Sequence, residues 1–259
     1  MSPTSCADPV FTLSGARVRL VEAGPGTGPL RNNPAHHVGD ELELVEARRL
    51  ALARGLGRPI AWMNQTHSSR VAVLTSTPSG PRLEIDDETA PFDPADPLAN
   101  IEADGLIVDA RAWAQAPAAA VMTADCLPVL LAGDSGLIAA VHAGRLGLLG
   151  GILPKALAAM RAIDDAPVRA FIAPAICGRC YEVPETMRAA CAIRLPGSSS
   201  ITSWGTPALD LVAAGRRQLE EAGCREVRVD PRCTFEDEHL HSYRRNRACG
   251  RNAAIIRPD

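Results

Sequence analysis

The sequence predicts a single α+β domain with a mixed β-sheet core and flanking helices. Apolar residues make up 46% of the 259 positions, which is enough to fill one complete core. Short apolar runs typical of buried strands are interspersed with longer amphipathic segments typical of helices. Because no internal repeat, low-complexity tract or linker divides the chain, we expect residues 1–259 to form one domain.

The N-terminal half is expected to be mostly sheet. Residues 10–21 have the pattern of a strand or hairpin, and residues 40–55 that of a helix with Asp40 as its N-cap and Gly55 or Gly57 at its end. The acidic, proline-containing segment 76–100 is expected to be an exposed loop. Short apolar strands are predicted over 60–63, 71–75, 105–108, 118–123, 127–132 and 137–142.

The C-terminal half alternates helices and strands. Helices are predicted over about 147–162, 184–194 and 208–222, and strands over 168–172, 226–229 and 253–257. Their helices would flank the sheet-rich middle of the chain.

Charge and cysteine content exclude several classes of function. The net charge is −3 and the basic residues are dispersed, so we expect no nucleic-acid partner. The N-terminus has no signal-peptide pattern and no apolar run is long enough to span a bilayer, which predicts a cytoplasmic protein without a membrane partner. Eight cysteines are too few for a disulfide scaffold, so a special cysteine would be a metal ligand or a nucleophile.

Three polar donors stand at the ends of predicted apolar strands. His67 follows one strand, Cys126 lies at a strand junction, and His142 ends the run "LIAAVH". Imidazole and thiolate are unfavourable to bury alone but are natural Zn²⁺ ligands, and three protein ligands leave a fourth position open. The spacing matches no short zinc-finger pattern. The residues alone therefore leave three interpretations: a metal site, ordinary buried residues, or a Cys–His hydrolase.

Several motifs carry a family resemblance. The segments "NQTHSSRV", "ADGLIV", "TADCLPVLL", "AAVHAGRLGLL", "CYEV" and "SYRR" occur in the order and approximate spacing of one family. The chain resembles the laccase-domain purine nucleoside phosphorylases, which are YfiH-type proteins formerly described as polyphenol oxidases. The resemblance covers about residues 30–256.

This resemblance implies a zinc enzyme. It implies that His67, Cys126 and His142 bind one Zn²⁺ and form the catalytic centre, with purine nucleoside and phosphate as substrates. Adenosine, inosine or methylthioadenosine would be cleaved to base and ribose 1-phosphate, and adenosine could also be deaminated by zinc-activated water. Alternatives are editing of peptidoglycan precursors, purine binding without turnover, and a copper oxidase, although one His2Cys site lacks the several centres that oxygen reduction requires.

The supporting residues are less determined by their patterns. Asn33 and Gln65 fall at polar positions of the family and would contact ribose or base, or stabilise loops. Asp125 directly precedes the expected ligand Cys126, so on a strand its side chain would point to the opposite face, which favours a structural role. The Cys177-x-x-Cys180 spacing suggests half a zinc site, but no second Cys-x-x-Cys exists, so Cys180 is expected to line the pocket.

Arginines are the candidates for binding phosphate. Arg244 and Arg245 in "SYRR" offer planar donors. Where the family reads His-Ala-Gly-Trp-Arg-Gly, this chain has Arg145 and Leu146, and we expect Arg145 to reach the pocket while Leu146 packs into the core. A serine, Ser68, replaces the glycine after the first histidine ligand. The sequence does not fix the oligomeric state, and a monomer is favoured.

Overall fold

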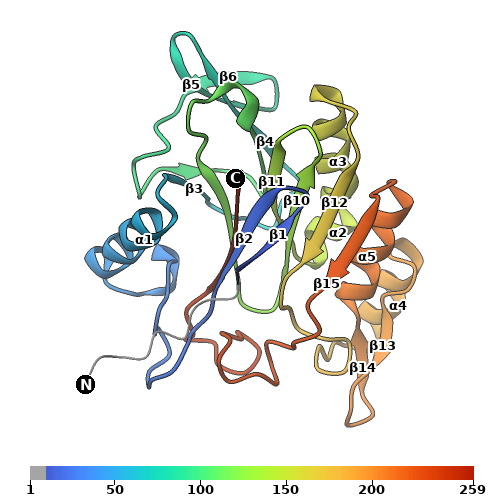
Figure 1. The fold of residues 1–259 in the computed structure, drawn as a ribbon. Coiled ribbons are helices and arrows are strands. Elements are labelled where there is room, and N and C mark those ends of the chain that lie inside the picture. The colour runs from blue at the N-terminus through green and yellow to red at the C-terminus, as the bar shows by residue number, and fades with distance from the viewer. Residues whose placement is uncertain (1–9) are drawn as a thin grey trace.

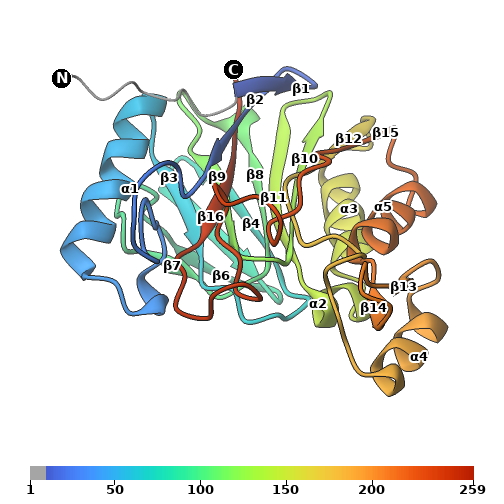
Figure 2. The same cartoon turned by 90° about the horizontal axis from the view of Figure 1, so that it is seen from below.

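Two stacked β-sheets with helices on both outer sides form the structure, a computed structural model that describes residues 10–259. Figures 1 and 2 show one helix beside the first sheet and the other four beside the second. The predicted α+β class is confirmed, and both sheets mix parallel with antiparallel pairs.

The first sheet contains the chain's N-terminal hairpin and its last strand. Neighbouring strands are β1 (Val10–Leu13), β2 (Ala16–Val21), β16 (Asn252–Arg257), β9 (Ala118–Thr123), β3 (Ile60–Met63) and β7 (Asn100–Ile101). The strands predicted over 60–63, 118–123 and 253–257 lie here, and residues 10–21 form a hairpin.

The second sheet has more strands and contains all of the remaining predicted strands. Its order is β15 (Glu226–Val229), β12 (Val168–Ile172), β10 (Leu127–Gly133), β11 (Leu137–Ala143), β8 (Gly105–Asp109), β4 (Val71–Thr77), β5 (Gly80–Ile85) and β6 (Glu88–Pro91). A small hairpin, β13 (Ser199–Ile201) and β14 (Pro207–Leu209), was not predicted.

Helices cover the outer faces of both sheets. They are α1 (Leu42–Leu56), α2 (Arg145–Leu149), α3 (Ile152–Ile163), α4 (Glu185–Arg194) and α5 (Leu211–Glu221), with short 3-10 turns at His36–Val38 and Ala110–Ala112. One apolar cluster packs α1 on the first sheet, one fills the space between the sheets, and one packs α3 and α5 on the second sheet.

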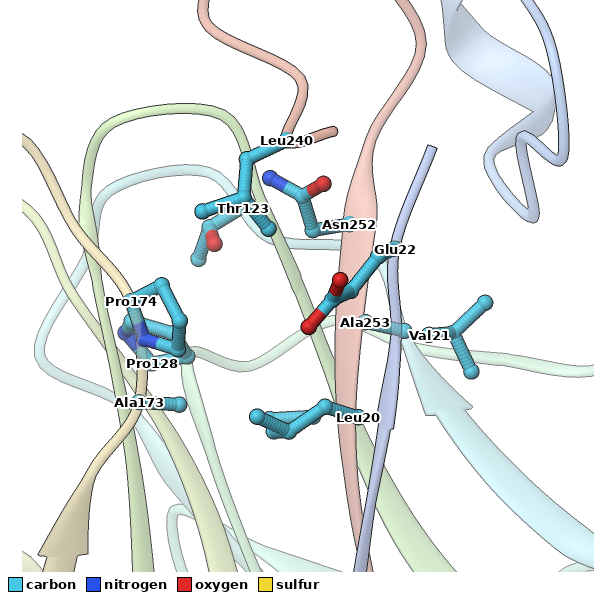
Figure 3. A pocket seen from close by; sticks show the side chains of 11 residues that line it. Leu20, Val21, Glu22, Thr123, Pro128, Ala173, Pro174, Leu240, Asn252 and Ala253 are labelled. Carbon is cyan, nitrogen blue, oxygen red and sulfur yellow. The ribbon is translucent and has the colours of Figure 1, made fainter. Parts of the chain in front are cut away.

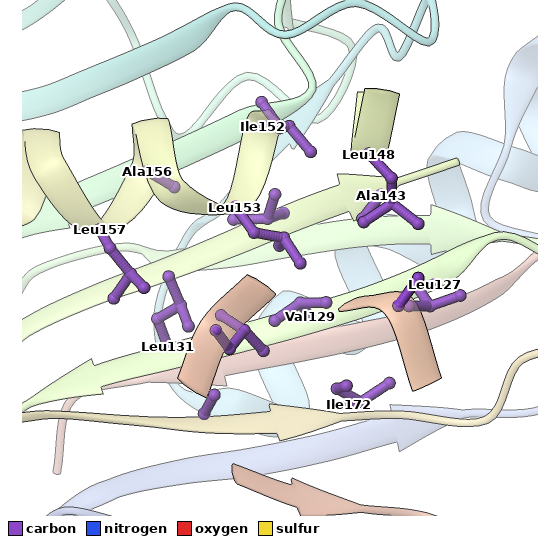
Figure 4. Close-up of a cluster of buried hydrophobic side chains, with 14 of the residues drawn as sticks. Leu127, Val129, Leu131, Ala143, Leu148, Ile152, Leu153, Ala156, Leu157 and Ile172 are labelled. Carbon is purple, nitrogen blue, oxygen red and sulfur yellow. The ribbon is translucent and has the colours of Figure 1, made fainter. Parts of the chain in front are cut away.

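Strands β10 and β11 are buried on both faces, which explains their unbroken apolar runs. In β10, Val129 and Leu131 point to the cluster under α3 and α5, as Figure 4 shows, while Leu130 points between the sheets. A polar side chain in such a strand has no water to solvate it. His142 in β11 therefore needs a partner within the protein.

Two predicted helices have different ends from those expected. Helix α1 begins at Leu42 after Glu41, and Asp40 instead accepts a hydrogen bond from the Glu41 N–H and pairs with Arg48. The predicted helix 147–162 is divided into α2 and α3, because Gly151 between them has a left-handed conformation (φ 73°) that interrupts the helix.

The loop predicted over 76–100 is wrong for most of its length. Strands β5 and β6 form a meander with β4, and the turn between them places Asp86 and Asp87 in the left-handed region. That conformation is typical of a type I′ hairpin turn, usually signalled by Asn-Gly or Asp-Gly. Prolines are tolerated here because Pro91 lies on the edge strand.

No helix within residues 10–259 combines the length and the apolar character needed to cross a bilayer.

Candidate metal centre and substrate pocket

The three predicted donors converge on one point. His67 lies in the turn after β3, Cys126 in the crossing from β9 to β10, and His142 in β11, where it pairs with Pro128 of β10. Their ligand atoms lie within 4.8 Å of one another, and Cys126 Sγ is 3.7 Å from His67 Nε2. Stacking of the two sheets thus brings together residues that are 59 positions apart in the chain.

A buried carboxylate holds both histidines in place. Asp104, which has no exposed surface, accepts a hydrogen bond of 2.7 Å from His142 Nδ1. It also accepts backbone bonds from Thr66, His67 and Ser68 and a bond of 2.5 Å from the Ser68 hydroxyl. Because an ionised carboxylate only accepts, His142 Nδ1 carries a proton, and Nε2 is the nitrogen that faces the cluster and would bind a metal after losing its own proton.

Asp104 is a site residue that the sequence analysis missed. It stands in "ADGLIV", directly before the buried strand β8, in the same strand-end setting as the donors. The Ser68 hydroxyl adds a bond to Asp104 that a glycine, which the family pattern has at this position, cannot make.

Charge on the cluster is redistributed toward a thiolate. Burial raises the pKa of Cys126, but hydrogen bonds with His142 and His67 outweigh burial and lower the pKa to about 6. Burial lowers the pKa of His142, whereas its bonds to Asp104 and Cys126 raise it to about 9. A thiolate is the form in which cysteine binds metal or attacks an electrophile.

The backbone approaches the donors closely on one side. A Cβ at Gly144, the residue before α2, would lie 2.8 Å from His67 Cδ2 and 3.1 Å from Cys126 Sγ. No side chain fits there, so a glycine is required by space rather than by backbone conformation.

Asp125 points away from the donors and anchors the C-terminal segment. Its backbone is left-handed (φ 99°), and its carboxylate accepts bonds from the Thr234 hydroxyl at 2.7 Å and the Arg244 N–H at 2.6 Å. This agrees with the structural role expected for it.

The donors face a pocket of about 520 Å³. Its wall contains two tyrosines, Tyr181 and Tyr243, and two arginines, Arg244 and Arg251. The Arg244 guanidinium lies 5.1 Å from the Tyr181 ring centre, and Arg251 is 6.0 Å from that of Tyr243. The volume lies in the range of small-molecule sites, and the lining offers flat aromatic rings together with positive charge.

Two residues predicted to contact substrate make hydrogen bonds within the protein. Gln65 lines the pocket, but its amide makes two bonds to the Met122 backbone, of 2.6 and 2.8 Å. Asn33 is fully buried and outside the pocket lining, and its amide bonds to Ala35, Asp40 and the Arg251 N–H. The structure therefore places Asn33 in support of its loop, outside the pocket lining.

The predicted arginines divide into different roles. Arg244 lines the pocket, whereas Arg245 binds backbone carbonyls of Thr234, Phe235 and Asp237 and orders that loop. Arg251, which was not predicted, is the second pocket arginine.

Helix α2 orients its first two residues differently from the expectation. Arg145 is outside the pocket lining but lies near the Tyr181 hydroxyl, where its charge counters the rise in the tyrosine pKa caused by burial. Leu146 is 53% exposed, so its predicted packing into the core is wrong: it lies on the outer face of a short surface helix.

Cys180 is not in the pocket lining, in contrast to the expectation. Its thiol belongs to a second group of possible ligands with Cys177, Cys233 and Glu236.

A separate small void lies beside the site, between β2, the start of β10 at Pro128 and the loop at Pro174 (Figure 3). Its volume of about 10 Å³ admits at most one water molecule. The hydroxyl of Thr123 borders it and has no hydrogen-bond partner. This void is too small for a substrate.

Comparison with known proteins identifies the family. The chain belongs to the family described as multi-copper polyphenol oxidoreductase laccase, whose sequence profile matches residues 22–259. The predicted family resemblance is confirmed.

Individual relatives match over nearly the whole chain. A Streptomyces coelicolor protein named purine nucleoside phosphorylase is 42% identical over 95% of this chain and 96% of its own. The Escherichia coli protein YfiH, which carries the same enzyme name, is 32% identical over 86% of this chain and 85% of its own. The Neisseria meningitidis protein NMB0706 has a similar fold, with a TM-score of 0.77 and 29% identity over 97% of this chain and 99% of its own.

Proposed function

We propose that this protein is a zinc-dependent purine nucleoside phosphorylase that acts on adenosine, inosine and methylthioadenosine and also deaminates adenosine. The observation that carries the proposal is the convergence of His67, Cys126 and His142 within 4.8 Å at a pocket that two arginines line. The enzyme name shared by relatives that match almost the entire chain supports it.

The donor set fits a catalytic zinc ion. Two imidazoles and one thiolate are typical zinc ligands, and three protein ligands leave one position for water or substrate. When bound, zinc would supply Lewis acidity for activating water or polarising the purine. Asp104 keeps the proton of His142 on Nδ1, and the lowered pKa of Cys126 supplies a thiolate at neutral pH.

The pocket wall fits the other two parts of the reaction. Tyr181 and Tyr243 offer faces for stacking a purine ring. Arg244 and Arg251 offer guanidinium donors for phosphate. Within residues 10–259, each guanidinium donates hydrogen bonds to backbone carbonyls through Nη1 alone. Their remaining nitrogens can bind an anion.

A Cys–His hydrolase is the second candidate. In such an enzyme Cys126 would be the nucleophile, His142 its base, and Asp104 the carboxylate that orients the histidine. The third donor, His67, has no role in that mechanism but has one in metal binding. Copper oxidation is less well supported, because only two of the six histidines belong to a ligand cluster within residues 10–259.

The test combines metal analysis with product analysis. The purified protein is incubated with each of the three nucleosides, with and without phosphate, and its zinc content is measured. Ribose 1-phosphate formed only with phosphate would support phosphorolysis, and inosine formed from adenosine without phosphate would support deamination. Cys126→Ala should lose both activities together with the zinc of this centre, whereas Cys224→Ala, a half-buried cysteine outside both clusters, should retain them. A metal-free protein that hydrolyses amides or esters would establish the hydrolase instead.

A further inference from the structure

A second group of metal-ligating side chains lies outside the pocket. Cys177, Cys180, Cys233 and Glu236 bring three sulfurs and one carboxylate oxygen within 4.8 Å of one another. We propose that these four residues bind a structural zinc ion, separate from the centre at His67, Cys126 and His142. This proposal does not depend on the proposed function.

Two similar turns present the four ligands. In the first, the N–H groups of Cys180 and Tyr181 both donate to the Cys177 carbonyl, at 3.0 and 3.1 Å. In the second, the N–H groups of Glu236 and Asp237 both donate to the Cys233 carbonyl, at 3.2 and 2.9 Å. Each turn therefore offers a ligand pair three residues apart, as zinc-binding turns do. The sequence analysis found only the Cys-x-x-Cys half of a possible zinc site, and the second half is the Cys-x-x-Glu of Cys233 and Glu236.

The backbone aligns the two turns before any metal is present. Ala175 and Cys233 form a parallel bridge, and the Cys177 N–H donates to Cys233 Sγ at 3.3 Å. With metal bound, this N–H would remain hydrogen-bonded to the ligand sulfur and help to orient it. Gly178 lets the first turn pack closely on Asp210 at the start of α5, because a Cβ there would lie 2.7 Å from Asp210 Cβ.

The ligand types favour zinc over the alternatives. Buried cysteines alone are common in apolar cores, and Cys180 and Cys233 do pack with Ile176. The carboxylate of Glu236 distinguishes this cluster. Without metal, its Oε1 accepts a bond of 3.4 Å from the Cys180 thiol, and its Oε2 lies 3.9 Å from Arg179. Metal binding would release the thiol proton and leave Oε1 facing the sulfurs as the fourth ligand atom. Three cysteines cannot all be paired in disulfides, and an iron–sulfur cluster takes four cysteines.

Bound zinc would join two parts of the pocket wall. Cys180 precedes Tyr181, whose side chain lines the pocket, and Cys233 precedes Thr234, whose hydroxyl binds Asp125. A closed set of four protein ligands is typical of a structural site and leaves no position for substrate. The ion would hold the turn at 177–181 against the segment that begins at 230.

The decisive experiment measures zinc in a variant without the first centre. Cys126→Ala, purified under reducing conditions, loaded with zinc and desalted, should retain about one zinc ion per chain. Adding Cys180→Ala should remove that ion, while adding Cys224→Ala should not, because Cys224 is outside the cluster. Zinc below about a tenth of an ion per chain in Cys126→Ala would overturn the proposal.

A second set of measurements protects against misfolding and oxidation. If Cys180→Ala does not fold, Glu236→Gln at the exposed end of the cluster should still weaken zinc binding at least about tenfold, in the range seen when a ligand environment is impaired. Cobalt bound to the Cys126→Ala protein should give thiolate-to-metal charge-transfer absorption that the additional Cys177→Ser change reduces. A disulfide among the three cysteines, found by non-reducing peptide mapping of zinc-loaded protein, would contradict a metal site.

Discussion

Replacing Asp104 with asparagine removes a charge while preserving the side-chain shape. Oδ2 of Asp104 faces three donors, which are two N–H groups and the Ser68 hydroxyl, and Oδ1 faces two, the His67 N–H and His142 Nδ1. The amide NH₂ should take the Oδ1 position, because His142 can move its proton to Nε2 and accept a bond at Nδ1. Only the His67 N–H is then left without an acceptor.

The magnitude follows from these contacts. One unsatisfied buried donor costs about 1–3 kcal/mol, and the bonds that remain change from charge-assisted to neutral. We expect the metal-free protein to lose about 2–4 kcal/mol of unfolding free energy. Because Nε2 of His142 would now carry a proton and not a lone pair, zinc affinity at the first centre should fall about 10- to 100-fold.

Urea denaturation in the presence of chelator measures the unfolding free energy of the metal-free Asp104→Asn protein. Competition with a chromophoric chelator measures its zinc affinity. The matched control is Asp109→Asn, at the other end of the same strand, where the carboxylate bonds to Arg111 near the surface. Zinc affinity within a factor of about two of the parent, at unchanged stability, would show that Asp104 does not set the histidine tautomer.

Three further predictions test the approach of the backbone, the pocket wall and the buried histidines. Gly144→Ala should displace two ligands and abolish zinc binding at this centre, while Gly133→Ala, whose Cβ would meet only ordinary contacts from 3.6 Å, should retain it. Arg251→Ala should lower phosphate-dependent kcat/KM about 10- to 150-fold while adenosine deamination persists, and equal loss of both reactions would refute a phosphate role. Burial lowers the pKa of His241 to about 4, so below pH 6.5 the unfolded chain binds a proton that the native state does not. Stability should therefore fall by about 2 kcal/mol between pH 7 and 5 through this residue, and His241→Gln should have a flatter pH profile in urea unfolding.

The sequence revealed the site where a buried strand ended in a polar residue. Strands β10 and β11 are covered on both faces, so their apolar runs are unbroken and the polar residues Cys126 and His142 stand out. A metal site formed with His67 was one of three interpretations that the residues left open, and the family resemblance selected it, because separation along the chain contains no information on how two sheets stack. The predicted strands were reliable for the same reason, since burial on both faces leaves a strong pattern.

The missed residues lacked a distinguishing local signal. Nearly all of the 27 basic residues are arginine, so Arg251 could not be separated from surface arginines. Glu236 completes a ligand set only after two distant turns meet, and one Cys-x-x-Cys gave no reason to look for a carboxylate. Asp104 did have a signal, a carboxylate and glycine directly before a buried strand, and it is the residue that further sequence reasoning would have found.

The left-handed backbone at Asp125 has a consequence for how a substrate is positioned. Cys126 faces the proposed metal centre while the preceding carboxylate holds the main chain of Arg244, so the proposed metal centre and the proposed phosphate-binding wall are attached to consecutive residues. Consecutive Cα atoms are about 3.8 Å apart whatever the packing around them. Inserting or deleting a single residue at this crossing would therefore separate the two attachments even if the packing of the two sheets were unchanged.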